Sequence, residues 1–178
     1  MKLLVVRHGR TDWNDLKKVQ GIADIELNNE GKEQAKKTAE LLKDKNIDLI
    51  ISSPLIRTRQ TAEIINEERN IEILFDDRIK ERDYGEFEGL KKDIFGFHDF
   101  WIYSKNLRYE KAENIQDFFK RIYGFLDEIK EKYKDKTVLI VIHGGVSVAL
   151  DAYFNGLPQN NKPTSGAMKN CEVREYEL

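Results

Sequence analysis

The stretch LLVVRHG, residues 3–9, decides how the rest of the chain is interpreted. Its four apolar residues do not alternate with polar ones, which predicts a strand covered on both faces by helices. A second stretch of this kind, VLIVIHGG, occupies residues 138–145. Two of the three histidines, His8 and His143, therefore follow a strand directly and precede a glycine. Because ligands bind at the carboxyl ends of strands in α/β proteins, we expect both imidazoles at one shared site.

Length and composition are those of one domain with its own core. The chain has 178 residues, of which 40% are hydrophobic and 35% charged. We expect a single domain over residues 1–178, with a short cap-like insertion at about residues 90–112. The 30 basic residues nearly balance the 32 acidic ones, so the overall charge predicts neither nucleic acid nor an anionic membrane as a partner.

The sequence also carries signals about location. No apolar stretch approaches the roughly 18–20 residues of a membrane-spanning helix, and the first residues are typical of a strand rather than of a signal peptide. The single cysteine, Cys171, cannot form an internal disulfide. These observations predict a cytoplasmic protein. A secreted protein given without its leader is the alternative, and the oligomeric state stays open.

The remaining chain alternates predicted strands and helices. Strands are expected at about residues 2–7, 49–52, 71–74 and 138–142, with an edge strand at 172–178. Helices are expected at about residues 30–45, 55–69, 115–133 and 146–154, the first of them capped by Asn28 or Asn29. Residues 10–26 and 78–89 are expected to be loops, and residues 90–109 an aromatic-rich insertion with helical parts. This alternation predicts an α/β protein with a mainly parallel sheet between helices.

Charged and small residues near the two strand ends indicate an anionic ligand. Arg7 precedes His8, and Gly9 allows a ligand to approach the backbone. Arginine makes forked hydrogen bonds to phosphate or carboxylate, each worth about 1.5–3 kcal/mol. Arg57 falls in the first turns of a predicted helix, where free backbone amides favour anions. A surface role for Arg57 is an equally good interpretation of that residue alone.

A loop supplies candidate acids. The segment KERDYGEFEG at residues 80–89 contains four acidic residues, any of which could be a general acid, and a merely solvated loop is the alternative. The chain has no GxxxxGK[ST] phosphate loop, no GxGxxG segment and no dense His/Asp cluster for two metals. Cys171 and Arg174 are too close for a loop that wraps phosphate around a thiolate. The chemistry left is catalysis by a nucleophilic histidine, and we expect no metal or other cofactor.

The motifs, taken in order, resemble those of the histidine phosphatase superfamily, also called phosphoglycerate mutase-like. They are LVVRHGRTDWN at residues 4–14, QG at 20–21, LNNEG at 27–31 with QA at 34–35, SSPLIRT at 52–58 with QTA at 60–62, ERDYG at 81–85 with EG at 88–89, and HGG at 143–145. They span residues 3–145. The resemblance implies a three-layer α/β/α sandwich with a mostly parallel central sheet.

The resemblance also implies roles for individual residues. His8 is expected to be the nucleophile that forms a phosphohistidine. Arg7, Arg57 and His143 are expected to form the phosphate pocket, with His143, if protonated, as a third donor. Glu81 matches the general acid. A nucleophilic imidazole has to be neutral, and its second nitrogen needs a fixed acceptor such as a backbone carbonyl.

Further positions matching the family are expected to contact substrate. Asn14 matches a phosphate contact, Gln20 and Gly21 match a substrate-binding stretch, and Gly144 belongs to the HGG motif at the site. Arg10 departs from the family, in which many members carry glutamate or glutamine. It could favour a substrate with a second anionic group, or it could point outward and pair with a carboxylate.

The insertion bears on the choice of activity. Mutases of the family usually enclose the site with more chain, so the short cover at residues 90–112 favours a phosphatase open to water. The expected substrate is a small phosphorylated metabolite such as a sugar phosphate, a phosphoglycerate or α-ribazole phosphate. The alternatives are a phosphoglycerate mutase-type transfer and a non-catalytic phosphate-binding regulator. Aromatic residues of the insertion could wall the site, but ordinary packing is preferred for most of them: Phe95, Phe97, Phe100, Trp101, Tyr103 and Tyr109, with His98 read as structural or exposed.

Overall fold

One sheet organises the protein. The computed structural model describes residues 1–93, 96–159 and 163–178. Five strands pair in the order β3-β2-β4-β1-β5, and every pair is parallel except β1 with β5. The strands are β1 (Lys2–Arg7), β2 (Leu49–Ser52), β3 (Ile73–Phe75), β4 (Thr137–Ile142) and β5 (Val173–Glu177). The predicted mostly parallel sheet and its C-terminal edge strand are confirmed.

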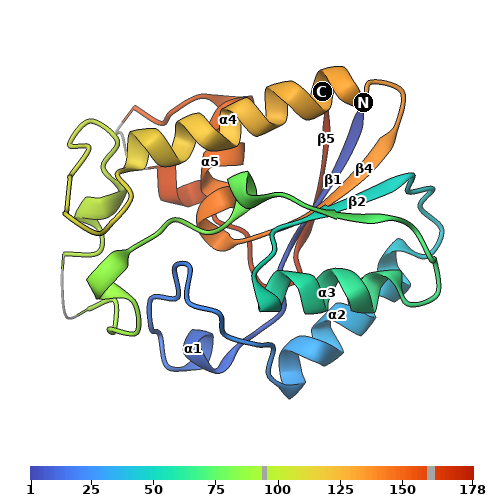
Figure 1. Cartoon of the computed structure of the whole chain (residues 1–178), viewed down its shortest axis with the longest axis horizontal. Helices are drawn as coiled ribbons and strands as arrows, with labels where there is room; N and C mark the ends of the chain where they lie inside the picture. The colour runs from blue at the N-terminus through green and yellow to red at the C-terminus, as the bar shows by residue number, and fades with distance from the viewer. Residues whose placement is uncertain (94–95, 160–162) are drawn as a thin grey trace.

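Helices cover both faces of this sheet, as the resemblance implied. In Figure 1, α2 and α3 lie on one side of the strands, and α4 and α5 lie on the other. The α-helices are α1 (Asp12–Asp15), α2 (Asn29–Leu42), α3 (Ile56–Asn66), α4 (Ile115–Lys132) and α5 (Gly144–Asn155). Short 3-10 turns are η1 (Asp77–Ile79), η2 (Gly85–Phe87), η3 (Asp99–Trp101) and η4 (Pro163–Gly166). Within the described residues, no helix is long and apolar enough to span a membrane.

The unbroken apolar run of β1 is explained by its two buried faces. Leu3 and Val5 belong to the hydrophobic cluster that includes α4 and α5. Leu4 and Val6 belong to a second cluster, shared with α2 and α3. Successive side chains of a strand point to opposite faces, so no position in the run is left for a polar residue. Each fully buried Leu or Val contributes about 1.5–3 kcal/mol, which fixes the register of β1 and the place where it ends.

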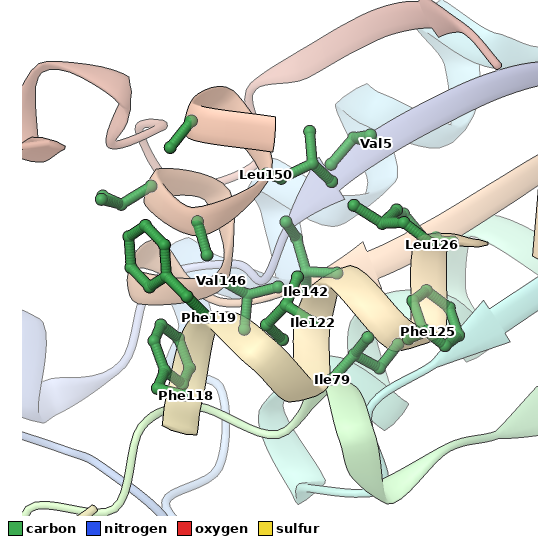
Figure 2. Close-up of a cluster of buried hydrophobic side chains, with 14 of the residues drawn as sticks. Val5, Ile79, Phe118, Phe119, Ile122, Phe125, Leu126, Ile142, Val146 and Leu150 are labelled. Carbon is green, nitrogen blue, oxygen red and sulfur yellow. The ribbon is translucent and has the colours of Figure 1, made fainter. Parts of the chain in front are cut away.

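Helix α4 supplies much of the larger cluster. Figure 2 shows Phe119 and Ile122 of α4 turned toward Val146 and Leu150 of α5, with Ile142 of β4 among them. The helix begins where Asn114 accepts a hydrogen bond from the amide of residue 117. The three- and four-residue spacing of apolar side chains predicted this helix within one residue at its C-terminal end.

The element boundaries differ from the predicted ones in two places that matter for the site. Helix α5 begins at residue 144 rather than 146, directly after His143. The expected loop after Gly9 contains the short helix α1. Its capping box joins Thr11 and Asn14, each side chain bonding the other residue's backbone amide. Asn14 stands where this motif usually has glutamate or glutamine, so the capping box is hard to recognise in the sequence.

Smaller boundary differences lie elsewhere. Helix α2 ends at residue 42 rather than 45, and Asn28 rather than Asn29 is its cap. Helix α3 ends at residue 66 rather than 69, and β3 covers residues 73–75 rather than 71–74. Asn70, between these two elements, has a φ of 53°, a conformation that neither a right-handed helix nor a strand continues.

The aromatic insertion is packed onto the body of the protein. Phe100 and Trp101 are buried in the larger cluster, and Tyr103 lies 5.2 Å from Phe119 between ring centroids. This fits the preferred interpretation of ordinary packing for most of these side chains, although Phe97 and Trp101 also line the cavity described below. Phe95 lies outside the described residues.

Candidate active site

The two strand–histidine–glycine segments end side by side. Strands β1 and β4 are parallel neighbours, with Arg7 opposite Ile142. The backbone amide of His8 donates to the carbonyl of Ile142 at 2.9 Å. The imidazole centroids of His8 and His143 lie 5.4 Å apart. Sheet pairing alone therefore brings together two residues that are 135 positions apart in the sequence.

A cavity of about 290 Å³ opens at these strand ends. Its walls include Val19, Tyr84 and Trp101, and Lys18, Lys92 and His98 also line it. Of the predicted site residues, all but His143 line this cavity: Arg7, His8, Asn14, Gln20, Gly21, Arg57, Glu81 and Gly144. The sequence motifs therefore converge on one space.

His8 is held as a neutral imidazole with one nitrogen available. Its Nδ1 lies 2.7 Å from the carbonyl oxygen of Gly9. A carbonyl can only accept, so Nδ1 carries the proton and Nε2 keeps its lone pair. Burial, together with the positive charges of Arg57 and Arg7, lowers the pKa of His8 well below its usual value. The predicted carbonyl acceptor is thus present, and His8 stays unprotonated at neutral pH.

The backbone around His8 is fixed from three sides. The amide of Gly9 donates to Thr61 Oγ1 of α3 at 3.0 Å. Asn170 Nδ2 donates to the carbonyl of His8 at 3.0 Å. A Cβ on Gly9 would lie 2.5 Å from the carbonyl oxygen of Gly31, so only glycine fits this close approach of two chain segments.

Arg57 is fully buried, and each of its three nitrogens donates one hydrogen bond, so that each terminal nitrogen has a second hydrogen for a ligand. Nη1 donates to the carbonyl of Ala23 at 2.7 Å, and Nη2 donates to the carbonyl of Gly21 at 2.6 Å. Nε donates to His143 Nδ1 at 3.2 Å. Burial lowers the pKa of Arg57 to about 10, while Glu81 is the largest influence that opposes the shift. The guanidinium therefore remains a fixed cation beside His8 at neutral pH.

The position of His143 differs from the donor expected of it. Its Nδ1 accepts from Arg57, so the ring proton is on Nε2, which donates to Ser53 Oγ at 2.8 Å. Burial, and then the charge of Arg57, lowers the pKa of His143 well below its usual value. His143 is thus a neutral residue behind Arg57, and in this arrangement it orients the arginine rather than pointing a donor into the cavity.

Arg7 has N–H groups that are available to a ligand. Its Nη1 donates to the carbonyl of Met168 at 2.5 Å. Its Nε is buried and has no hydrogen-bond partner among the described residues. A Cβ on Gly144 would lie 3.2 Å from the guanidinium carbon, so glycine at this position lets Arg7 pass close to the start of α5. A buried, unpaired N–H of a cation is a strong site for an anionic oxygen.

Glu81 faces the same cavity with both carboxyl oxygens positioned. Oε2 accepts from the amide of Gly145, in the first turn of α5, at 2.8 Å, and Oε1 accepts from the amide of Arg82 at 2.9 Å. A Cβ on Gly145 would lie 2.1 Å from Oε1, which accounts for the second glycine of the HGG motif. Each oxygen keeps a second lone pair, so the group can still take up and release a proton.

A clamp from α4 holds the segment that carries Glu81. Arg121 donates to the carbonyls of Lys80 and Glu81 at 2.9 and 3.0 Å. Glu113 accepts from the same guanidinium through both oxygens, at 2.7 and 2.9 Å. Nothing in the sequence indicated that Glu113 pairs with Arg121.

The polar residues of the first loop also converge on the cavity. Asn14 Oδ1 accepts from the amide of Thr11 at 3.1 Å, so its amide nitrogen is the group it can offer a ligand. Gln20 Oε1 accepts from Thr11 Oγ1 at 3.0 Å. Arg10 does not line the cavity. It pairs with Asp15 and Glu30, as the outward-pointing interpretation predicted.

Several contributors were not predicted. Ser53 and Thr61 lie in the quoted motifs SSPLIRT and QTA, but only the fold shows that they hold His143 and Gly9. Asn170 lies after the last motif, and nothing in the sequence indicated that it contributes to the site. Among the described residues, no group of three or more His, Cys, Asp or Glu side chains could hold a metal ion.

Comparison with known proteins identifies the family of the chain. Residues 3–178 match the histidine phosphatase superfamily (branch 1). The chain belongs to this superfamily. Curated relatives of this histidine phosphatase include the uncharacterized phosphatase PhoE of Bacillus subtilis, which is 38% identical over 96% of this chain and 88% of its own length. Phosphoserine phosphatase 1 of Hydrogenobacter thermophilus is 36% identical over 80% of this chain and 71% of its own.

A solved structure shows the same fold. Bacillus stearothermophilus YhfR superposes with a TM-score of 0.90 and 27% identity, covering 99% of this chain and 91% of that one. The α/β/α sandwich and the mostly parallel sheet of this histidine phosphatase are therefore those of its family. The phosphatase names of its relatives support a phosphatase activity.

Proposed function

We propose that the protein is a metal-independent phosphomonoesterase that transfers the phosphoryl group of a small phosphorylated metabolite to His8 and then to water. The observation that carries this proposal is the state of His8. Its proton is fixed on Nδ1 by the Gly9 carbonyl, its pKa is lowered, and two arginines flank it. A neutral nucleophile beside two cations is what attack on a phosphate dianion requires.

The first step forms a bond from His8 Nε2 to phosphorus and breaks the ester P–O bond. Arg7 and Arg57 stabilise the charge on the phosphoryl oxygens. Glu81 gives its proton to the leaving oxygen, so that an alcohol departs. The Nδ1–H of the phosphorylated ring remains bonded to the Gly9 carbonyl and shares the positive charge that the ring has gained.

The second step returns the enzyme to its starting state. Glu81, now a carboxylate, takes a proton from water as the water oxygen attacks phosphorus. The P–N bond breaks, inorganic phosphate leaves, and His8 regains its lone pair. The two arginines supply in this reaction the positive charge that a metal ion supplies in other phosphatases.

Two lysines of the cavity lining bear on the substrate. Lys18 and Lys92 line the cavity, and their Nζ atoms lie 5.4 and 5.2 Å from the ring centroids of Trp13 and Phe97. These two lysines, rather than Arg10, are the cations placed to bind a second anionic group. The proposed substrates are therefore small phosphomonoesters that carry a further carboxylate or phosphate, and the cytoplasm, as expected from the sequence, is the proposed location.

The direct test is hydrolysis of 4-nitrophenyl phosphate with a chelator present. Metal-independent release of nitrophenol and phosphate would support the proposal. A panel of phosphorylated metabolites, assayed for phosphate release alongside mutase activity on 3-phosphoglycerate, then separates hydrolysis from phosphoryl transfer between substrate positions. Tight phosphate binding without turnover would instead indicate a binding regulator and contradict the proposed activity.

A further inference from the structure

Glu88, which follows η2, joins two loops of the site from outside the cavity. Its Oε1 accepts from the amides of Ile22 and Tyr84, at 2.8 and 3.2 Å. Its Oε2 accepts from the amide of Ala23 at 2.9 Å. One carboxylate thus receives three backbone hydrogen bonds, two of them from the loop that follows Gly21. Burial raises the pKa of Glu88 above its usual value, against the opposing influence of these amides.

The same short loop contacts Arg57 through its carbonyls. Gly21 and Ala23 accept from Nη2 and Nη1 of Arg57 at 2.6 and 2.7 Å. Residues 21–23 are therefore held between two charged groups, with amides bonded to the carboxylate and carbonyls bonded to the guanidinium. The peptide group between Gly21 and Ile22 is bonded at both ends, through its N–H to Glu88 and through its C=O to Arg57. Hydrogen bonds linked in this way polarise and strengthen one another.

Gly21 shows how tightly the carboxylate packs against this loop. It has a φ of 52°, and a Cβ there would lie 1.8 Å from Glu88 Oε1. The loop can therefore lie against Glu88 only because residue 21 is glycine. Electrostatics act in the same direction, since the charge of Glu88 is one of the influences that oppose the lowering of the Arg57 pKa.

We propose that Glu88 is a positioning residue for Arg57, and that it fixes the two carbonyls that aim the guanidinium at a phosphoryl group. The proposal rests on the proposed function in so far as Arg57 binds phosphate. It assigns Glu88 no contact with substrate. Without the carboxylate, the loop at 21–23 loses its anchor, and Arg57 keeps its charge but loses the acceptors that set its plane.

The test is a double-mutant cycle read by binding of inorganic phosphate, measured by calorimetry. Glu88→Gln replaces one acceptor oxygen with an NH2 group that faces a backbone N–H. We expect it to weaken phosphate binding about tenfold, the effect of losing one well-positioned charge-assisted bond. The matched control is Glu86→Gln, an exposed acid on the same loop, which should leave binding unchanged.

The double-mutant cycle shows whether Glu88 affects phosphate binding through Arg57. In an Arg57→Ala background, Glu88→Gln should weaken phosphate binding less than about twofold further, since its target is already gone. Full additivity would mean that Glu88 acts elsewhere, and it would overturn the proposal, as would unchanged binding in Glu88→Gln alone. Glu88→Asp, which keeps the charge on a shorter side chain, should lie between wild type and Glu88→Gln and serves if the amide variant does not fold.

Turnover of 4-nitrophenyl phosphate, assayed separately, keeps the two proposals apart. A wild-type protein that binds phosphate but hydrolyses no ester would contradict the proposed phosphatase activity, while the cycle would still report on Glu88 and Arg57. A general loss of structure is recognised by thermal unfolding, which should differ little between Glu88→Asp and the Glu86→Gln control.

Discussion

Two parts of the cavity lining are built in different ways. At the part where we propose that phosphate binds, called the phosphate end, His8 and Arg57 are buried and Arg7 is half-buried. All three side chains are bonded to backbone carbonyls. A second, more exposed part of the lining consists of Lys18, Lys92 and His98 and is called the outer rim; its two lysines lie over aromatic rings, and its histidine is exposed. Under the proposed function, this difference means that the sheet and the backbone hydrogen bonds fix the catalytic groups, whereas more mobile side chains on loops choose the substrate.

Arg57→Ala should produce the largest loss at the phosphate end. Removing a buried cation that we propose binds the transferred group should lower kcat/KM for phosphate esters by about 10³-fold. His143→Ala should cost only about tenfold, because His143 holds Arg57 through one hydrogen bond. Steady-state kinetics on both variants and their combination checks this ranking. A His143 loss that persists in full without Arg57 would show that His143 has its own role in the cavity.

Glu81→Gln should lower kcat/KM by about 10²-fold, in a way that depends on the leaving group. Alkyl phosphates need a proton on the departing oxygen, so they should lose most. 4-Nitrophenyl phosphate, with its stable leaving anion, should lose least. Asp83→Asn, in the same loop but outside the cavity lining, is the control. An equal loss for both kinds of ester would contradict the role of general acid.

The outer rim is tested by removing its charges together. Lys18→Met with Lys92→Met should lower kcat/KM about tenfold for 3-phosphoglycerate and much less for glycerol 3-phosphate, which lacks the carboxylate. Lys17→Met with Lys91→Met removes two charges from the same loops without touching the cavity lining. Parallel loss on both substrates would mean that the two lysines do not recognise a second anion.

More residues of the phosphate end than of the outer rim could be predicted from the sequence, for a physical reason. The apolar runs fixed where β1 and β4 end, and so they placed His8 and the HGG glycines together. Side chains that hold a catalytic residue through its backbone, such as Asn170 and Arg121, have no recognisable sequence pattern. They contact their partners, which are distant in the sequence, only after folding. The sequence left two alternatives for Arg10, either binding a second anionic group of the substrate or pairing with a carboxylate of the protein. The structure shows the second, with ion pairs to Asp15 and Glu30.

Burial of two neutral histidines should make stability depend on pH. In the native protein His8 and His143 have lowered pKa values, while in the unfolded chain they bind protons near pH 6.5. Below that pH only the unfolded state gains these protons. Stability should therefore fall as the pH drops, by up to about 1.4 kcal/mol per pH unit for each histidine, until the native pKa is passed.

Urea unfolding between pH 7.5 and 5 measures this slope. His143→Gln should make it shallower, while His98→Gln, at the exposed rim, should keep it. An unchanged slope in the His143 variant would mean that this residue is not held neutral by the fold.

The most direct test of the central claim is to locate the phosphoryl group during turnover. The protein is mixed with substrate, quenched without acid and digested, and the phosphorylated peptide is read by mass spectrometry. We predict one acid-labile phosphoryl group on His8, absent from His8→Ala, which should also lose turnover. A phosphoryl group on another residue, or turnover surviving in His8→Ala, would contradict the assignment of His8 as the nucleophile.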